Sequence, residues 1–197
     1  SGGASDDVIN INGTDGVRAN AEVNGGAGDD IIKATDDQAI IFGEVLGGDG
    51  NDLIEAKAVG TDGIVDGGVE NDTINATTVY GAAKLLGGEG NDEMEVDFAF
   101  NGAFFDGGAG NDKIIIGGLG SDGEAGAPVS LQGGAGDDNL GLKTDNPGLI
   151  GTAPVKMEIS SPSGSNILQG GFFSDTITGG AARDVIYGGA GKIESDT

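Results

Sequence analysis

The chain has 197 residues, and its 33 Asp and Glu against 9 Lys and Arg give a formal net charge of −24. This charge argues against nucleic acid and anionic membranes as partners, because both repel carboxylates. The absence of cysteine and histidine excludes disulfides and leaves hard, oxygen-liganded cations as the candidate metals. No apolar run reaches the length of a membrane-spanning helix.

The glycine content predicts a thin core. There are 42 glycines but only 7 Phe, 2 Tyr and no Trp. Ordered glycine loses more backbone entropy than any other residue, so apolar burial has to be supplemented by another source of stability. Bound metal is the candidate that the acidic composition favours.

Residues 1–142 contain a regular repeat that starts with paired glycines. The steps from Gly47 to Gly107 are twenty residues each, and the aligned unit reads apolar-x-G-G-x-G-[N/D]-D-x-apolar-x-apolar. Period-two alternation of the apolar positions predicts a short strand on each side of the Gly-rich hexapeptide, which we interpret as the turn between them. Such a unit winds into a parallel coil that buries its inward side chains only by stacking on the next coil. The predicted fold is therefore all-β, a parallel β-roll or β-helix solenoid with coils of about twenty residues.

The repeat changes toward the C-terminus. Residues 143–166 contain three prolines and are predicted to form an extruded loop, with a possible short strand at Val155–Ile159. In residues 167–197 the glycine pairs follow at intervals of nine residues, which predicts further coils of the same solenoid with eighteen residues each. In these coils Gly170 and Gly188 are expected on one side and Gly179 on the other.

The last aspartate of each hexapeptide predicts a cation site. Stacked strands lie ~4.8 Å apart, so a column of these carboxylates would repel by roughly 3 kcal/mol per neighbouring pair. A Ca²⁺ ion between successive turns reverses this effect, because it takes ~6 to 8 oxygen ligands and two turns offer carboxylates and peptide carbonyls. The second turns, such as Lys57–Asp62, share no cation-binding pattern. The ladder of calcium turns is therefore expected on one side of the solenoid.

These residues closely resemble the RTX (hemolysin-type calcium-binding) nonapeptide G-G-x-G-x-D-x-U-x, a repeat that forms calcium-binding β-helices. The best matches are the segments 25–32, 47–54, 87–94, 107–114 and 133–140. The resemblance implies several Ca²⁺ ions between turns on the same side, bound by Asp carboxylates and backbone carbonyls. It also implies bacterial secretion and folding in external calcium. The implied metal ligands are Asp7, Gly25, Ala27, Gly28, Asp30, Gly47, Asp49, Gly50, Asp52, Gly67, Asp72, Gly87, Glu89, Gly90, Asp92, Gly107, Ala109, Gly110, Asp112, Gly133, Gly136, Asp138, Asp175 and Asp184.

Some turns depart from this pattern at the fourth position. Glu70 replaces the glycine there in the turn 67–72, and Ser5, Phe173 and Ala182 do so in three other turns. We expect the sites at these turns to be distorted, weaker or empty.

The sequence favours a structural role over catalysis. The first hypothesis is a secreted, calcium-binding structural module of a bacterial surface layer, adhesin or extracellular filament. The alternatives are a ligand- or glycan-binding module that presents the loop 143–166, and an accessory folding domain of a secreted enzyme. We expect no enzymatic activity, since Arg18 and Arg183, the candidates for a lyase-like site, lie near opposite ends of the chain. The expected partners are calcium and either flanking domains of a larger chain or further copies stacked head to tail.

Overall fold

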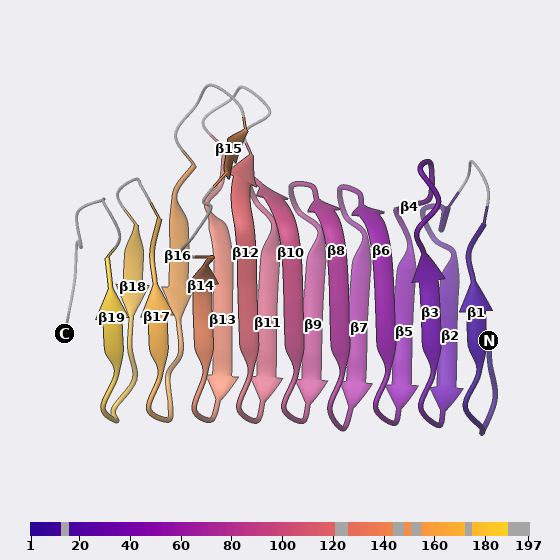
Figure 1. The fold of residues 1–197 in the computed structure, drawn as a ribbon, viewed down its shortest axis with the longest axis horizontal. Coiled ribbons are helices and arrows are strands. Elements are labelled where there is room, and N and C mark those ends of the chain that lie inside the picture. The colour runs from indigo at the N-terminus through magenta and orange to yellow at the C-terminus, as the bar shows by residue number, and fades with distance from the viewer. Residues whose placement is uncertain (13–15, 121–125, 144–147, 151–154, 172–174, 189–197) are drawn as a thin grey trace.

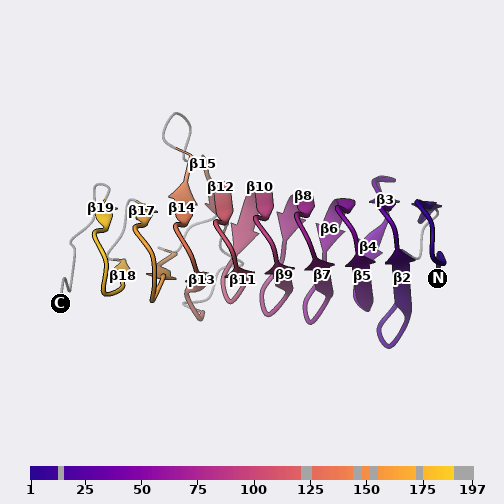
Figure 2. The same ribbon diagram turned by 90° about the horizontal axis from the view of Figure 1, so that it is seen from below.

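A computed structural model describes residues 1–12, 16–120, 126–143, 148–150, 155–171 and 175–188. The regular elements of these residues are strands, which form two parallel sheets that face each other (Figures 1 and 2). The predicted all-β parallel solenoid is therefore confirmed. The part of the chain that is described contains no helix of the length and hydrophobicity that a membrane span requires.

One turn of the solenoid uses one strand from each sheet. Sheet A consists of β2 (Glu22–Ala27), β5 (Glu44–Asp49), β7 (Ile64–Val69), β9 (Lys84–Glu89), β11 (Phe104–Ala109), β13 (Val129–Ala135), β16 (Met157–Ser160) and β18 (Thr176–Thr178). Sheet B consists of β1 (Val8–Asn10), β3 (Ile31–Ala34), β6 (Leu53–Val59), β8 (Thr73–Val79), β10 (Glu93–Phe100), β12 (Lys113–Gly120), β14 (Asn139–Leu142), β17 (Ile167–Gln169) and β19 (Val185–Tyr187). Two short strands also join sheet B, β4 (Ile40–Ile41) beside β6 and β15 (Gly148–Ile150) beside β12.

The Gly-rich segments connect sheet A to sheet B along one edge of the solenoid, the lower edge in Figure 1. The glycine pair itself belongs to the strand, since β5 includes Gly47 and Gly48 and pairs with β7 through Gly48 and Gly68. The interpretation of the whole hexapeptide as a turn was therefore too broad. The chain reverses within the last three positions, which are Gly50 to Asp52 in this coil.

The two sheets enclose a single thin core. Its inward side chains are those that the alternation predicts, and they form rows along the solenoid. The sheet A row comprises Val45, Val65, Leu85, Phe105, Leu131, Ile159 and Ile177, and the main sheet B row comprises Ile32, Ile54, Ile74, Met94, Ile114, Leu140 and Leu168. These side chains are at most 1% exposed, so each coil depends on both of its neighbours for burial.

In the twenty-residue coils the opposite edge carries tight turns with no glycine–aspartate pattern. In three successive coils the first and fourth residues of the turn are joined by a backbone hydrogen bond, as from Gly63 N–H to the Gly60 carbonyl at 2.9 Å. The third residue of each turn has a positive φ, at Asp62 (66°), Ala82 (60°) and Gly102 (84°). These turns satisfy their own backbone groups and leave the glycine–aspartate edge as the candidate site.

The segment 143–166 contributes strands to both sheets. The β15 backbone pairs with β12, and β16 lies between β13 and β18 in sheet A. Part of the segment thus belongs to the solenoid instead of to an extruded loop. Residues 144–147 and 151–154, which make up much of the predicted loop, lie outside the described residues.

The last coils have the predicted eighteen-residue period. The register pairs Ile167 with Val185 in sheet B and Glu158 with Thr176 in sheet A. Gly170 and Gly188 accordingly follow sheet B strands, whereas Gly179 follows a sheet A strand on the glycine–aspartate edge. The predicted position Phe173 lies outside the described residues.

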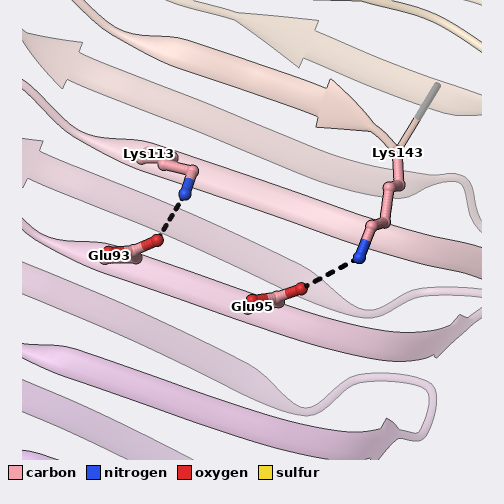
Figure 3. A network of polar contacts seen from close by, with 4 residues as sticks. All are labelled: Glu93, Glu95, Lys113 and Lys143. Atoms are coloured by element: carbon pink, nitrogen blue, oxygen red, sulfur yellow. Dashed lines mark hydrogen bonds and ion pairs between the residues drawn. The ribbon is translucent and has the colours of Figure 1, made fainter. Parts of the chain in front are cut away.

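The outer face of sheet B carries ion pairs between coils. Lys113 contacts Glu93 on the neighbouring strand, and the Lys143 Nζ atom lies 3.5 Å from Glu95 (Figure 3). Lys33 and Glu55 form a similar pair at 2.6 Å. Exposed pairs of this kind contribute only ~0 to 1 kcal/mol each to stability. They therefore do not offset the repulsion that the large negative charge causes.

Candidate metal centre

The predicted carboxylate column exists and is buried. The aspartates at the sixth hexapeptide position are 1–3% exposed although they carry charge, and they comprise Asp30, Asp52, Asp72, Asp92, Asp112 and Asp138. Equivalent residues are 22 positions apart from Asp30 to Asp52 and then 20 positions apart up to Asp112. Parallel pairing of the flanking strands therefore stacks them one above another.

One oxygen of each carboxylate is used by the protein itself. The Oδ1 atom of Asp52 accepts the backbone N–H of Asp30 at 2.7 Å, and the same bond recurs from Asp52 N–H to Asp72 and from Asp72 N–H to Asp92, both at 2.8 Å. The series begins with Asp7 N–H to Asp30 at 2.7 Å. These bonds were not anticipated, because they join residues of different coils. They hold each carboxylate in a fixed orientation.

The second oxygen has no such partner. Among the described residues, the buried oxygens that accept no hydrogen bond are the Oδ2 atoms of Asp30, Asp52, Asp72, Asp92 and Asp112. A buried acceptor without a donor is costly, and more so when it is charged. Five consecutive coils repeat this arrangement, which indicates a partner that the chain itself does not supply.

The first glycine of each pair creates the space around this oxygen. A Cβ atom on Gly47 would collide with Asp52 Oδ2 and with the carbonyl oxygen of Gly67 in the next coil. The same two oxygens meet at Gly25, Gly67 and Gly87 in their own coils. The missing side chain thus leaves a cradle in which a carboxylate oxygen and a carbonyl oxygen converge, and any other residue would fill it.

Burial raises the pKa of four carboxyls of the column, those of Asp52, Asp72, Asp92 and Asp112. Desolvation raises the pKa of Asp52 to about 6 and the pKa of Asp72 and Asp112 to about 7. The hydrogen bond from the preceding backbone N–H opposes this shift in each case, while neighbouring carboxylates add to it. The site therefore favours a bound positive charge, either a proton or a cation.

The fourth position sets the backbone that lets the chain reverse. Gly50, Gly90 and Gly110 have φ values of 126°, 136° and 138°, a region that side chains rarely adopt. Glu70 occupies this position with φ 77°, so its backbone departs from that of the glycines. The expected distortion of the turn 67–72 is present in the backbone, yet Asp72 still forms its bond to Asp52 N–H.

At the third position the candidate ligand is the backbone, since the side chains of Asp49, Glu89 and Ala109 are exposed. The Asp49 carbonyl accepts the Gly28 N–H at 2.8 Å, and the Ala109 carbonyl accepts the Gly90 N–H at 2.7 Å. A carbonyl oxygen has two lone pairs, so each can still contribute to a cation. The remaining predicted backbone ligands are Ala27 at the third position, Gly107 and Gly133 at the first position, and Gly28 and Gly136 at the fourth position of their turns.

An exposed ladder at the fifth position was missed by sequence reasoning. Asn71 donates its backbone N–H and its Nδ2 to Asn51 Oδ1, at 3.2 and 3.1 Å, and Asn91 repeats this pattern on Asn71 at 2.8 and 2.9 Å. Asn51 likewise bonds to Asp29, and these hydrogen bonds lower the pKa of the Asp29 carboxyl. The recurrence of Asn at this position was the available signal. The ladder joins the turns without a cation.

A degenerate turn at 161–166 was also missed. The residues Ser161-Pro-Ser-Gly-Ser-Asn166 take the place of Gly-Gly-x-Gly-x-Asp, with Ile159 and Leu168 at the flanking inward positions. Asp138 donates its N–H to Asn166 Oδ1 at 2.8 Å, as the aspartates do elsewhere in the column. Ile159 and Leu168 have the same spacing as the inward residues on either side of a regular turn, and this spacing could have identified the turn. The lack of a glycine pair concealed it.

Three predicted aspartates remain besides the six that form the buried column. Asp7 begins the column and Asp184 continues it beyond Asn166, whose N–H it accepts at 3.0 Å. Asp175 lies on the opposite edge, where its two oxygens accept the N–H groups of Met157 at 2.9 Å and Gly171 at 2.6 Å. Asp175 is therefore satisfied by the backbone and has a different environment from the other predicted ligands.

A family model described as RTX calcium-binding nonapeptide repeat (4 copies) matches residues 15–43 and 163–192. Residues 15–43 and 163–192 therefore carry RTX calcium-binding repeats. No curated protein and no solved structure matches it. The matched segments include the turn of Gly25 and the C-terminal turns of Gly170 and Gly179, and they leave out the twenty-residue coils between them. Those coils continue the same column of aspartates, so the RTX turn geometry extends through them.

The RTX turns fit calcium by the chemistry of their oxygens. No group of three or more acidic side chains that could hold a metal occurs within the described ranges, so each turn has to combine few carboxylates with carbonyls. The orphaned Oδ2 atoms and the adjacent glycine carbonyls provide this mixture. Hard oxygen ligands of this type, held with some freedom in number and geometry, suit Ca²⁺ better than the strictly octahedral Mg²⁺.

Proposed function

We propose that the chain is a secreted structural module in which calcium ions between stacked turns hold a rigid solenoid. The larger structure to which we assign this module is a bacterial surface layer, an adhesin or an extracellular filament. In this role the ions add to the stability that the thin core of a glycine-rich chain provides. They also neutralise part of its net charge of −24. No catalytic step is part of the proposal.

The observation that carries this proposal is the row of five buried Oδ2 atoms without a donor. A solenoid that served only as a scaffold for packing would have no reason to bury one charged acceptor per coil. The cost falls away when a cation binds, because Ca²⁺ contacts the carboxylate and the carbonyl that converge on the same cradle. Binding is then linked to folding, since the unfolded chain has no preformed site.

A comparison of the calcium-stripped and calcium-loaded chain tests the proposal. Far-UV circular dichroism should show β structure appearing in millimolar Ca²⁺ but not in the same concentration of Mg²⁺. Small-angle scattering should report contraction from an expanded chain to a rod at the same point. A chain with equal β content and equal dimensions with and without calcium would refute the role of the ions.

The two alternative roles differ in what they require of the chain. A ligand-binding module would lose its partner on deletion of the segment 143–166, but this segment also supplies β16 to sheet A. An accessory folding domain would need an enzyme in the same polypeptide. Head-to-tail assembly stays a prediction, and light scattering that rises with calcium and falls with chelator would support it.

A further inference from the structure

At two successive coils near the C-terminus, the protein supplies donors to the column. Ser161 Oγ donates to Asp138 Oδ2 at 2.6 Å, and both residues are buried. This contact explains why Asp138 does not share the unpaired oxygen of the five aspartates before it. The serine stands where those coils have the first glycine of the pair.

In the following coil, Asn166 occupies the aspartate position and is 1% exposed. Its Oδ1 accepts the Asp138 N–H, the same bond that the regular aspartates make through Oδ1. Its Nδ2 therefore stands in the place of the unpaired Oδ2. This nitrogen lies 2.9 Å from Asp184 Oδ1, 3.0 Å from the Ser163 carbonyl, 3.4 Å from the Gly164 carbonyl and 3.5 Å from the Ser161 carbonyl.

The surroundings of Nδ2 are four oxygens, one carboxylate and three peptide carbonyls. A set of this composition is what a hard cation requires. In the regular coils the corresponding atom is the acceptor Oδ2, which has no donor and meets a glycine carbonyl of the next coil at the cradle, so these oxygens repel until a cation enters. In the coil of Asn166 the atom is an amide donor with two hydrogens, so the cluster is already attractive.

We propose that Ser161 and Asn166 replace bound calcium with hydrogen bonds, so that the calcium-binding part of the column ends at Asp112. Asn166 is then the residue that decides whether its coil takes an ion. The coil around it keeps its turn at calcium concentrations that release the turns of Asp52 to Asp112. This inference rests on the proposed function, because it assumes that the regular coils bind calcium.

The first test counts ions on the full chain by native mass spectrometry in a calcium titration. The double variant S161G/N166D restores the glycine and the aspartate, and it should bind one more Ca²⁺ than the wild type. Asn111→Asp is the matched control, since it adds the same charge at the exposed fifth position, where Asp29 and Asp137 already occur. The control should bind as many ions as the wild type.

The possible outcomes separate the inference from the proposed function. A wild type that binds no calcium would overturn both. A wild type that binds calcium while the double variant binds the same number would overturn the inference alone. An equal gain in the Asn111→Asp control would also overturn it, because the extra ion would then follow from charge and not from the cradle.

A reverse substitution keeps the test valid if the double variant does not fold. Asp72→Asn should bind one ion fewer than the wild type and still fold in calcium, because an asparagine can keep the bond to Asp52 N–H and donate to the carbonyls. Asp72→Ala, which can do neither, should need more calcium to fold than Asp72→Asn. Equal calcium midpoints for the two variants, or loss of folding by Asp72→Asn in saturating calcium, would contradict the proposal.

Discussion

The coils of Asp52 to Asp112 and the coil of Asn166 belong to the same solenoid but satisfy their turns by different means. In the first group a buried Oδ2 atom lacks a donor in every coil, whereas in the second an amide nitrogen with two hydrogens lies within 3.5 Å of four oxygens. The solenoid therefore does not need calcium at every coil to make the turn. Each coil needs a cation or a hydrogen-bond donor at the position of the aspartate Oδ2 atom. Either an ion or a side chain can supply it.

The same comparison explains the variation in the outer ladder. The fifth position is Asn in the coils of Asp52 to Asp112, and there the side chains bond to one another along the exposed edge. This outer ladder carries no charge in those coils. It fixes the register of neighbouring turns beside a column of carboxylates that repel each other until they are neutralised.

The largest effect is expected from filling the cradle of a regular coil. Gly87→Ala would push a Cβ into Asp92 Oδ2 and the Gly107 carbonyl, and it should cost roughly 3 kcal/mol in saturating calcium. At Gly170 the added Cβ would lie 2.8 Å from Asp175 Oδ2 and 3.4 Å from the Gly188 carbonyl, so Gly170→Ala should cost about 1 kcal/mol. Urea unfolding of both variants measures the difference. Equal losses would mean that the two edges of the solenoid are more alike than the geometry indicates.

A smaller loss is expected when a carboxylate of the column is removed. Asp92→Ala leaves the Asp72 N–H without its acceptor and takes away the oxygen that faces the cradle, which should cost about 2 kcal/mol and raise the calcium concentration needed for folding. Asp6→Ala serves as the control, since Asp6 accepts the Asp29 N–H at an exposed site. If both variants have the same calcium midpoint, the assignment of the sixth position as the metal ligand is wrong.

The stability of the calcium-free chain should depend on pH with a defined sign. The folded-state pKa values of Asp52, Asp72 and Asp112 are raised to about 6, 7 and 7, above the ordinary value of 3.8. At pH values between the ordinary pKa and these raised values, the folded chain therefore binds more protons than the unfolded chain. Stability is then highest near pH 4 and falls as the pH rises to about 7. Far-UV circular dichroism of stripped protein across this range measures it, and β structure should be favoured near pH 4 and lost toward pH 7.

Calcium should reverse that trend, because the ion needs the ionised carboxylate. The calcium-loaded chain is expected to gain stability from pH 4 to pH 7 as protons cease to compete for Oδ2. A stripped chain that becomes more stable toward neutral pH would contradict the burial of the column.

The smallest effect is expected at the outer ladder. Asn71→Ala removes the side-chain bond to Asn51 and the two bonds from Asn91 at an exposed site, which should cost about 1 kcal/mol. The number of bound ions should stay unchanged, since the Asn side chain does not enter the cradle. Native mass spectrometry together with urea unfolding separates the two readouts, and loss of an ion would assign the fifth position to the metal site.

The sequence by itself determined the solenoid, its inward rows and the edge that carries the aspartates. Alternation around residues such as Val45 and Ile54 is local, so strand positions and their facing could be predicted without knowledge of distant contacts. The twenty-residue spacing of glycine pairs added the stacking, and the chemistry of Gly and Asp added the cation. These features depend on residue type and period alone.

Only the tertiary structure decided how each carboxylate is used. Whether Oδ1 of Asp52 bonds to Asp30 N–H, and whether Oδ2 is left over, depends on the register between coils 22 residues apart. The role of the Asn166 side chain is evident only once its turn stacks on Asp138, 28 residues before it. Composition conceals such a turn, because a serine and an asparagine can replace a glycine, an aspartate and an ion only when the neighbouring coil places acceptors around them.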